Sequence, residues 1–311
     1  MNRTFPLFLH HQEARGDSLA TWLASKPERL QHALADHGGL VFRGFEVVTP
    51  DDFQAVAEQC CDQLVADNGE HDRDSLTGSV YTPVRYRASE KLLWHNENTF
   101  NHFWPSRILF ACAQPAKVGG ETPIVDCRAL YRRLDAGIRA KFEQHGVMYV
   151  RRYTPGLGRS WQDIFNAQTR AEAETFLARN RMTAKWRGDL LETHAVRPAV
   201  WHHPQTGMAT WVNQAQHWHP SCLSEYLREA LADVVPPDQF PRDCRYGDGS
   251  RIEDAVMAEI LAVYAELEQS FAWEPGDVMV LDNTAVAHGR NPYRGKRKLY
   301  VAIGDLVAFP T

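Results

Sequence analysis

The segment Trp94-His95-Asn96-Glu97 contains residue types that can bind a metal ion. It follows the apolar pair Leu92-Leu93, so we expect it at the end of a β-strand. Side chains two residues apart in a strand point to the same side, so the His95 imidazole and the Glu97 carboxylate can reach one ion. With a second histidine they would form a 2-His-1-carboxylate site, which leaves coordination positions open for substrates. The best candidate for that histidine is His288, near the C-terminus.

The spacing alone is a weak signal, because His11-Gln12-Glu13 repeats it. That stretch is polar and no strand is expected before it, so we interpret it as solvated surface. A further group of histidines, His202, His203, His217 and His219, is spaced too loosely across a turn to indicate a second metal site.

Three other segments give the first motif its weight. Gly119–Pro123 contains Thr122, which lies 27 residues after His95. A Glu-Pro-Gly-Asp turn at 274–277 opens an apolar strand that leads to His288, and Arg297 follows nine residues after that histidine. The chain therefore offers the Thr122 hydroxyl and the Arg297 guanidinium as further polar groups for a site that contains a metal.

The elements that must position these residues are mostly short strands. Strands are expected at 80–85, 92–97, 107–113, 147–153, 277–282 and 298–303, and helices at 17–36, 50–65, 128–143, 171–181, 222–233 and 253–268. This order favours a mainly β fold with flanking helices, a jelly roll, over a doubly wound sheet. We expect one domain over residues 1–311, with a helical N-terminal part at about 1–78 and a β core at about 79–306. The polar stretch 67–78 is expected to be a mobile loop that could act as a lid.

Composition excludes several classes of protein. The chain has 311 residues and a net charge of -5, which gives no reason to expect a nucleic-acid partner. No apolar run is long enough to span a membrane, and the N-terminus lacks the features of a signal peptide. The six cysteines include no C-x-x-C spacing, so we expect free buried thiols and a cytoplasmic location.

In order and spacing, the four segments resemble the TauD/TfdA family of Fe(II)- and 2-oxoglutarate-dependent oxygenases, from about Gly38 to Ile303. The HNE form of the metal motif, GGETPIVD at 119–126, HPQTG at 203–207, WVNQ at 211–214 and YGDGS at 246–250 are similar to its SyrP-like branch, close to clavaminate synthase. The resemblance implies a double-stranded β-helix core of cupin type. It also implies hydroxylation of an amino acid or amino-acid-derived substrate in natural-product biosynthesis, with the substrate held on a carrier protein in several members.

Carried over to this chain, the resemblance implies that Fe(II) is bound by His95, Glu97 and His288. Arg297 would pair with the distal carboxylate of 2-oxoglutarate and Thr122 would hydrogen-bond it, since a guanidinium matches a carboxylate in a bidentate fork. O2 would take the remaining position at iron. The family often carries a second arginine four residues later, where this chain has Val301, which argues against a sulfonate substrate. The retained Glu97 argues against halogenation.

The substrate contacts are the least defined part of the site. Candidates are Asn98, Arg85, Arg87, Arg151, Arg152, Asn213 and Gln214, whereas Trp201, Trp211 and Trp218 fit a core better. Desaturation, epoxidation or cyclisation by the same cofactor chemistry remains an alternative to hydroxylation. The residues are also compatible with a non-catalytic jelly roll that binds a metal or small molecule, and with a zinc hydrolase. Sequence leaves the oligomeric state open.

Overall fold

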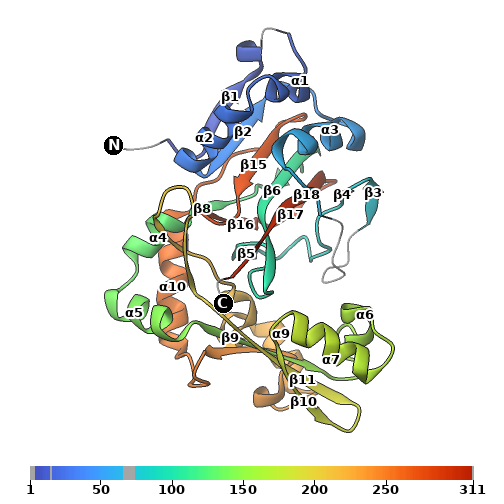
Figure 1. Cartoon of the computed structure of the whole chain (residues 1–311), viewed down its shortest axis with the longest axis vertical. Coiled ribbons are helices and arrows are strands. Elements are labelled where there is room, and N and C mark those ends of the chain that lie inside the picture. The colour runs from blue at the N-terminus through green and yellow to red at the C-terminus, as the bar shows by residue number, and fades with distance from the viewer. Residues whose placement is uncertain (1–3, 15, 66–73, 310–311) are drawn as a thin grey trace.

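The main body of the protein is a large sheet with helices on its outer face. The computed structural model describes residues 4–14, 16–65 and 74–309 (Figure 1). Across these residues one sheet of seven strands has the order β1(Leu7–His10), β2(Gly39–Arg43), β15(Val278–Asp282), β6(Phe103–Gln114), β18(Lys298–Ala308), β4(Val80–Tyr81) and β3(Ser75–Thr77). Strands β6 and β18 pair antiparallel along almost their whole lengths and form the backbone of this sheet.

A smaller sheet packs against the inner face of the large one. Its strands, in the order β5(Leu92–His95), β16(Val286–Arg290) and β8(Ile124–Asp126), are antiparallel. One apolar cluster joins the two sheets, with Phe110, Met279 and Val301 from the large sheet and Ile124 and Val286 from the small one. Alternate residues of each strand point into this layer because strand side chains alternate between faces. The mainly β, double-sheet fold expected from the sequence is confirmed.

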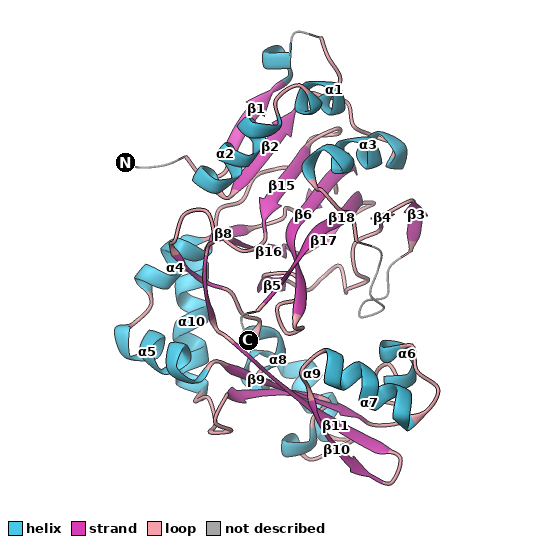
Figure 2. Cartoon of the chain, in the orientation of Figure 1, coloured by secondary structure: helices cyan, strands magenta, loops and turns pink. Residues whose placement is uncertain are grey.

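Three N-terminal helices cover the outer face of the large sheet (Figure 2). They are α1(Leu19–Ala24), α2(Pro27–His37) and α3(Pro50–Cys60). Proline opens α2 and α3, and Thr49 with Asp52 forms a capping box at the start of α3. The buried faces of these helices meet Leu40, Phe42 and Tyr300 in one cluster.

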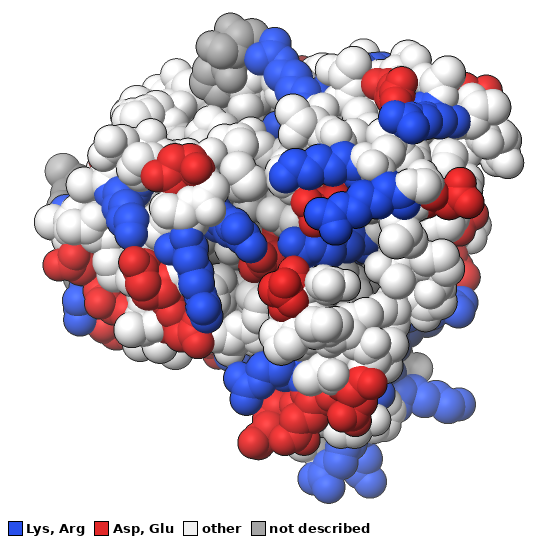
Figure 3. Space-filling model, turned by 90° about the horizontal axis from the view of Figure 1, so that it is seen from below, with Lys and Arg blue, Asp and Glu red and all other residues white. Residues whose placement is uncertain are grey.

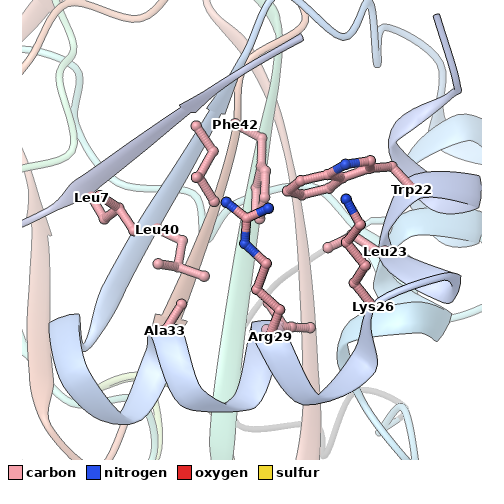
Figure 4. A pocket seen from close by; sticks show the side chains of 10 residues that line it. Leu7, Trp22, Leu23, Lys26, Arg29, Ala33, Leu40 and Phe42 are labelled. Carbon is pink, nitrogen blue, oxygen red and sulfur yellow. The ribbon is translucent and has the colours of Figure 1, made fainter. Parts of the chain in front are cut away.

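A small cavity lies between α1, α2 and the first strands (Figure 4). Its volume is about 40 Å³ and apolar side chains such as Leu7, Leu40 and Phe42 form its walls. The aliphatic stem of Arg29 reaches across it toward the Trp22 ring. The other charged residue of the described lining is Lys26, which also lies over the Trp22 ring.

A second lobe is built from the middle of the chain and lies at the bottom of Figure 1. Its sheet has the order β10(Thr183–Arg187), β11(Leu190–Arg197), β9(Val147–Tyr153) and β14(Arg242–Tyr246). The helices around it are α4(Cys127–Arg133), α5(Ala136–His145), α6(Trp161–Phe165), α7(Arg170–Arg179), α8(Ala215–Trp218), α9(Glu225–Ala232) and α10(Asp254–Leu267). The remaining short elements are β7(Val118–Gly119), β12(Val200–His202), β13(Ala209–Trp211), β17(Tyr293–Arg294), η1(His11–Ala14), η2(Pro220–Cys222) and η3(Pro237–Gln239).

Several boundaries differ from the sequence-based expectation. The helix expected at 128–143 is two helices, because Asp135 caps a new start by accepting hydrogen bonds from two backbone N–H groups. The strands expected at 107–113 and 298–303 are longer, since each supplies the ladder partners of the other. The strand expected at 80–85 ends at Tyr81. The hairpin of β10 and β11 was not expected.

Two further expectations concern the N-terminal third of the chain. Strand β1 ends immediately before the His11 motif, so the expectation of no strand there was wrong, although Gln12 and Glu13 are exposed as expected. The mobile loop expected at 67–78 falls largely on residues 66–73, which lie outside the described residues, and 75–77 belong to β3. Along the described ranges, no helix is long and apolar enough to cross a membrane.

Candidate metal and co-substrate site

The pairing of β5 with β16 brings together three side chains of metal-binding type. His95 and His288 are direct partners across these strands, and Glu97 follows β5 by two residues. The Glu97 Oε2 atom lies 3.5 Å from His95 Nε2 and 3.8 Å from His288 Nε2. All three are buried, with ligand atoms within 4.8 Å of one another. Small side-chain rotations suffice for the three donors to converge on one ion at the usual distance of roughly 2.1 Å.

The backbone fixes which nitrogen of His95 is free to bind a metal. The Leu93 carbonyl accepts a hydrogen bond from His95 Nδ1 at 2.9 Å, so the Nε2 lone pair faces Glu97. The same carbonyl accepts from His217 Nε2, also at 2.9 Å, and the two rings lie 4.6 Å apart. Burial, and then the neighbouring His95, lower the pKa of His217 to about 3. His217 is therefore a neutral donor that supports the metal motif from behind.

Buried amide side chains hold the backbone of the metal motif. Asn283 accepts from the Glu97 N–H at 2.7 Å and donates to the Glu97 and Pro105 carbonyls at 3.1 and 2.6 Å. Gln214 donates to the Asn96 carbonyl at 2.6 Å. Sequence analysis missed Asn283 as a supporting residue. Its position in a loop just after an apolar strand and five residues before His288 was the available signal.

Arg297 and Thr122 meet at one end of the same cavity. The Arg297 guanidinium donates from Nε to the Gly120 carbonyl at 2.9 Å, and its Nη2 lies 3.5 Å from Thr122 Oγ1. Trp273 donates to the same Thr122 oxygen at 3.2 Å. Gly120 has φ +78°, and a Cβ there would lie 3.1 Å from Arg297 Cδ, so the double glycine lets the arginine cross the turn.

Arg297 has no carboxylate partner within the described part of the chain. Burial, followed by repulsion from Arg290, lowers its pKa to about 10. Arg290 lines the same cavity and donates to the backbone carbonyls of Tyr86, Arg87 and Glu90. Two guanidinium groups and the Glu97 carboxylate thus face a space that also contains Thr122. A buried cation that lacks a counter-ion favours the binding of an anion, and two of them favour a dianion.

Of the expected substrate-contact residues, some lie near the three side chains of metal-binding type and others lie away from them. Asn98 is buried beside Glu97 and lines a neighbouring cavity. The others do not line the cavity that holds His95, Glu97 and His288. Two of them are exposed: Arg85 pairs with Asp74, and Arg87 pairs with Glu90 and covers the Tyr226 ring. Arg151 covers the Tyr153 ring, Arg152 pairs with Glu192, and Asn213 bonds backbone groups of Ala199 and Ala215.

Of the remaining histidines, His203 and His219 have hydrogen-bond partners, whereas His202 is exposed. His203 donates to Asp282 at 2.7 Å, and His219 bonds Ser221 and the Ile252 carbonyl. Trp211 and Trp218 are buried in the core of the second lobe. Within the described residues, the group of His95, Glu97 and His288 is the one set of potential metal ligands.

Comparison with known proteins identifies the chain as an oxygenase that uses Fe(II), 2-oxoglutarate and O2, and it also identifies the family. Residues 4–303 match the family model described as taurine catabolism dioxygenase TauD, TfdA family. The chain belongs to this family. It is similar to dapdiamide synthesis protein DdaC of Enterobacter agglomerans, with 35% identity over 89% of this chain and 85% of that protein. It is also similar to a clavaminate synthase-like protein of Arabidopsis thaliana, with 27% identity over 88% and 83%.

Solved structures show the same fold at lower identity. A taurine dioxygenase from Burkholderia xenovorans superposes with a TM-score of 0.55 at 19% identity, covering 98% of this chain and 92% of the other. AAD-2, solved in complex with Mn(II) and N-oxalylglycine, gives 0.51 at 16% identity, covering 92% and 88%. The enzyme class and cofactors inferred from the four sequence segments are confirmed by family membership, which also removes the non-catalytic jelly roll and the zinc hydrolase from consideration.

Proposed function

We propose that His95, Glu97 and His288 bind Fe(II) and that Arg297 with Thr122 binds the distal carboxylate of 2-oxoglutarate. The observation that carries this proposal is the buried three-donor cluster in one cavity with a guanidinium that has no carboxylate partner among the described residues. Iron and 2-oxoglutarate, when bound, activate O2 to oxidise a substrate C–H bond, with release of succinate and CO2. Arg297 and Arg290 compensate the charge of the co-substrate, while the apolar wall of Phe110 and Val301 limits water at the site.

We infer further that the reaction is hydroxylation of a small amino acid or amino-acid-derived substrate in natural-product biosynthesis. The similarity to a dapdiamide synthesis protein supports this direction. Desaturation, epoxidation and cyclisation remain alternatives because the outcome depends on where the substrate carbon lies. Product mass decides: gain of one oxygen indicates hydroxylation or epoxidation, and loss of two hydrogens indicates desaturation or ring closure.

Three further properties stay proposals. Carrier presentation of the substrate predicts turnover of the carrier-loaded amino acid and little turnover of the free one, and equal rates on both would contradict it. A single catalytic domain over residues 1–311 and a cytoplasmic location are likewise proposed. The six free cysteines are compatible with a reducing compartment.

Anaerobic titration with Fe(II) and 2-oxoglutarate tests the ligand assignments. A weak visible charge-transfer band should appear only with both present. It should be lost in His95→Ala and in Arg297→Ala, while Arg294→Ala, an exposed arginine three residues before Arg297, should keep it. Metal binding without the band in the wild type would contradict the 2-oxoglutarate site.

A further inference from the structure

We call the space lined by His95, Glu97, His288 and Arg297 the metal cavity. A second cavity lies further along the strands that form its wall, away from Arg297. In the metal cavity, Val301 of β18 faces its ladder partner Phe110 of β6. Further along the same strands, Ile303 and Leu306 line a cavity of about 400 Å³, and Pro105 is the ladder partner of Leu306. We call this space the distal cavity; it is also lined by Asn98, Phe176, Arg179 and Asn180.

Asn98 lines the distal cavity and is the chain neighbour of Glu97, which lines the cavity that holds His95 and His288. It directly follows Glu97 of the metal cluster and has a left-handed backbone with φ +60°, which asparagine tolerates better than most residues. Its side chain is only 2% exposed, and its Oδ1 atom is buried and accepts no hydrogen bond from the described residues. Leaving a buried acceptor unsatisfied costs about 1–3 kcal/mol, so this oxygen is poised for a donor on a ligand.

The opposite wall comes from the C-terminal end of α7. Arg179 is exposed there and has no ion-pair partner among the described residues. Buried Arg197 links the end of α7 to the segment that follows Glu97. Its guanidinium donates to the Asn180 carbonyl at 2.7 Å and to the Phe100 carbonyl at 3.1 Å. Among the residues that the structure describes, the lining thus contains one cation, several asparagines and apolar side chains, and no acidic residue.

We propose that the distal cavity receives the substrate and that the substrate is an amino acid acylated at its nitrogen, with an anionic group beyond it. The amide N–H donates to Asn98 Oδ1, the anion pairs with Arg179, and an apolar side chain packs on Phe176 and Ile303. A free amino acid would bring an ammonium group into a cavity whose charged lining residue, within the described ranges, is an arginine and not a carboxylate. This inference rests on the proposed function, since it takes Glu97 as a metal ligand.

Another cavity, of about 480 Å³, is the competing location. It lies beneath α9 and is lined by His217, Trp218 and Leu227. The His217 ring lies 4.6 Å from the His95 ring at an interplanar angle of 58° and shares its carbonyl acceptor, so this cavity approaches His95 from the side of His217. The lining of this cavity contains Glu90 as well as Lys91 and Arg242, and acidic and basic side chains are also interspersed on the face of the protein seen from below (Figure 3).

The test uses the full chain loaded with Mn(II) and N-oxalylglycine, an inert pair that keeps the site assembled. N-acetyl-L-leucine is titrated and the paramagnetic broadening of its proton NMR lines is measured. We expect broadening that saturates, with affinity lowered roughly tenfold or more in Arg179→Ala and by several-fold in Asn98→Ala. Arg187→Ala, an exposed arginine of the same lobe, should bind as the wild type does. N-acetyl-L-leucine amide and free L-leucine should bind at least about tenfold more weakly than the N-acetylated acid.

Several outcomes would overturn the inference. No broadening in the wild type, equal binding in Arg179→Ala, or loss of binding in Leu227→Trp but not in Arg179→Ala would each exclude the distal cavity. Selective binding of the phosphopantetheine thioester of N-acetyl-leucine, lost in Arg179→Ala, would keep the anion contact and assign it to the phosphate of a carrier arm. Mn(II) and N-oxalylglycine binding are measured separately, by electron paramagnetic resonance and calorimetry. Failure there would contradict the proposed function instead.

Discussion

At the scale of single residues, the site is supported by buried polar groups that hydrogen-bond one another. Asp282 is an example: its carboxylate accepts from His203 at 2.7 Å and from the N–H and hydroxyl of Thr284 at 2.9 and 2.7 Å. Arg107 lies 3.8 Å away. This group ties β15 to the segment around His203 and lies beside Asn283, which holds the Glu97 backbone.

Asp282→Asn should lower the free energy of unfolding by about 3 kcal/mol at pH 7, as expected when one partner of a buried charged pair is removed. Burial raises the pKa of Asp282, but the hydrogen bonds from His203 and Thr284 and the charge of Arg107 outweigh burial and hold it below the ordinary 3.8. A carboxyl group whose pKa is lower in the folded than in the unfolded protein stabilises the fold at pH values above its unfolded-state pKa. That stability is lost as the pH falls below about 4.

Denaturant titrations of the apo-protein at several pH values measure this effect. The stability of the wild type should fall more steeply than that of Asp282→Asn as pH drops below about 4. Asp238→Asn, at an exposed position, should follow the wild type. Parallel curves for all three proteins would contradict the assigned role of Asp282.

At the scale of elements, the metal cluster depends on how closely β16 approaches β5. Gly289 lies next to His288 in β16, and a Cβ atom at Gly289 would lie 2.6 Å from the Leu92 carbonyl oxygen. That separation is shorter than any ordinary contact, and the obstructing atom belongs to the backbone. Only glycine lets the two strands meet here, which sets the distance between His95 and His288.

Gly289→Ala should therefore separate β16 from β5. We expect a loss of about 1–3 kcal/mol in folding stability from overpacking and a loss of metal affinity of roughly tenfold or more. Thermal unfolding and Mn(II) titration measure the two effects. Gly137→Ala in the first turn of α5, where the near contact is the capping oxygen of Asp135, should leave the Mn(II) affinity unchanged.

Helix α9 contrasts with the rest of the second lobe. None of its side chains is buried, Tyr226 is 62% exposed, and cavities of about 480 and 500 Å³ lie on its two sides. In α10, by comparison, Met257, Ile260 and Tyr264 are buried.

We expect the amides of α9 to exchange with deuterium faster than those of the middle of α10, since local opening of α9 exposes little apolar surface. Hydrogen-exchange mass spectrometry with peptides covering 225–232 and 254–267 measures this. Equal protection of the two helices would show that α9 is held by contacts that its exposure does not reveal.

At the scale of the whole molecule, the metal cluster joins distant parts of the chain. His95 and His288 come from strands that are adjacent in space, and the apolar layer beneath them is shared by both sheets. An ion bound by both strands stabilises the folded state relative to an unfolded chain in which the ligands are apart.

Removal of the metal should consequently lower the unfolding temperature. At a free metal concentration of 100 times Kd, binding adds about 2.7 kcal/mol to the free energy of unfolding. Differential scanning calorimetry with Mn(II) and then with a chelator should show a drop of several degrees in the wild type. The difference should vanish in His288→Ala, and its persistence there would place the metal elsewhere.

The sequence by itself determined the residue chemistry and the kind of fold. A histidine and a carboxylate two residues apart at a strand end, a late histidine, and an arginine nine residues after it resemble the TauD/TfdA family in order and spacing, and that resemblance predicted the cofactor class. Strand and helix periodicity predicted most elements, because it reflects which face of each element is buried. The double glycine at 119–120 predicted a turn, which the positive φ values there require.

Only the tertiary structure decided how those residues meet and which neighbours support them. The buried side-chain amides of Asn283 and Gln214 hydrogen-bond backbone groups that are far away in sequence, so no local sequence pattern predicts these contacts. Arg85, Arg87 and Arg151 were equivalent candidates in sequence, yet packing turns each toward a carboxylate or an aromatic ring. The wall of the distal cavity combines β18 with the end of α7. This wall forms through packing between segments that are distant in sequence, and such packing cannot be predicted from a single sequence.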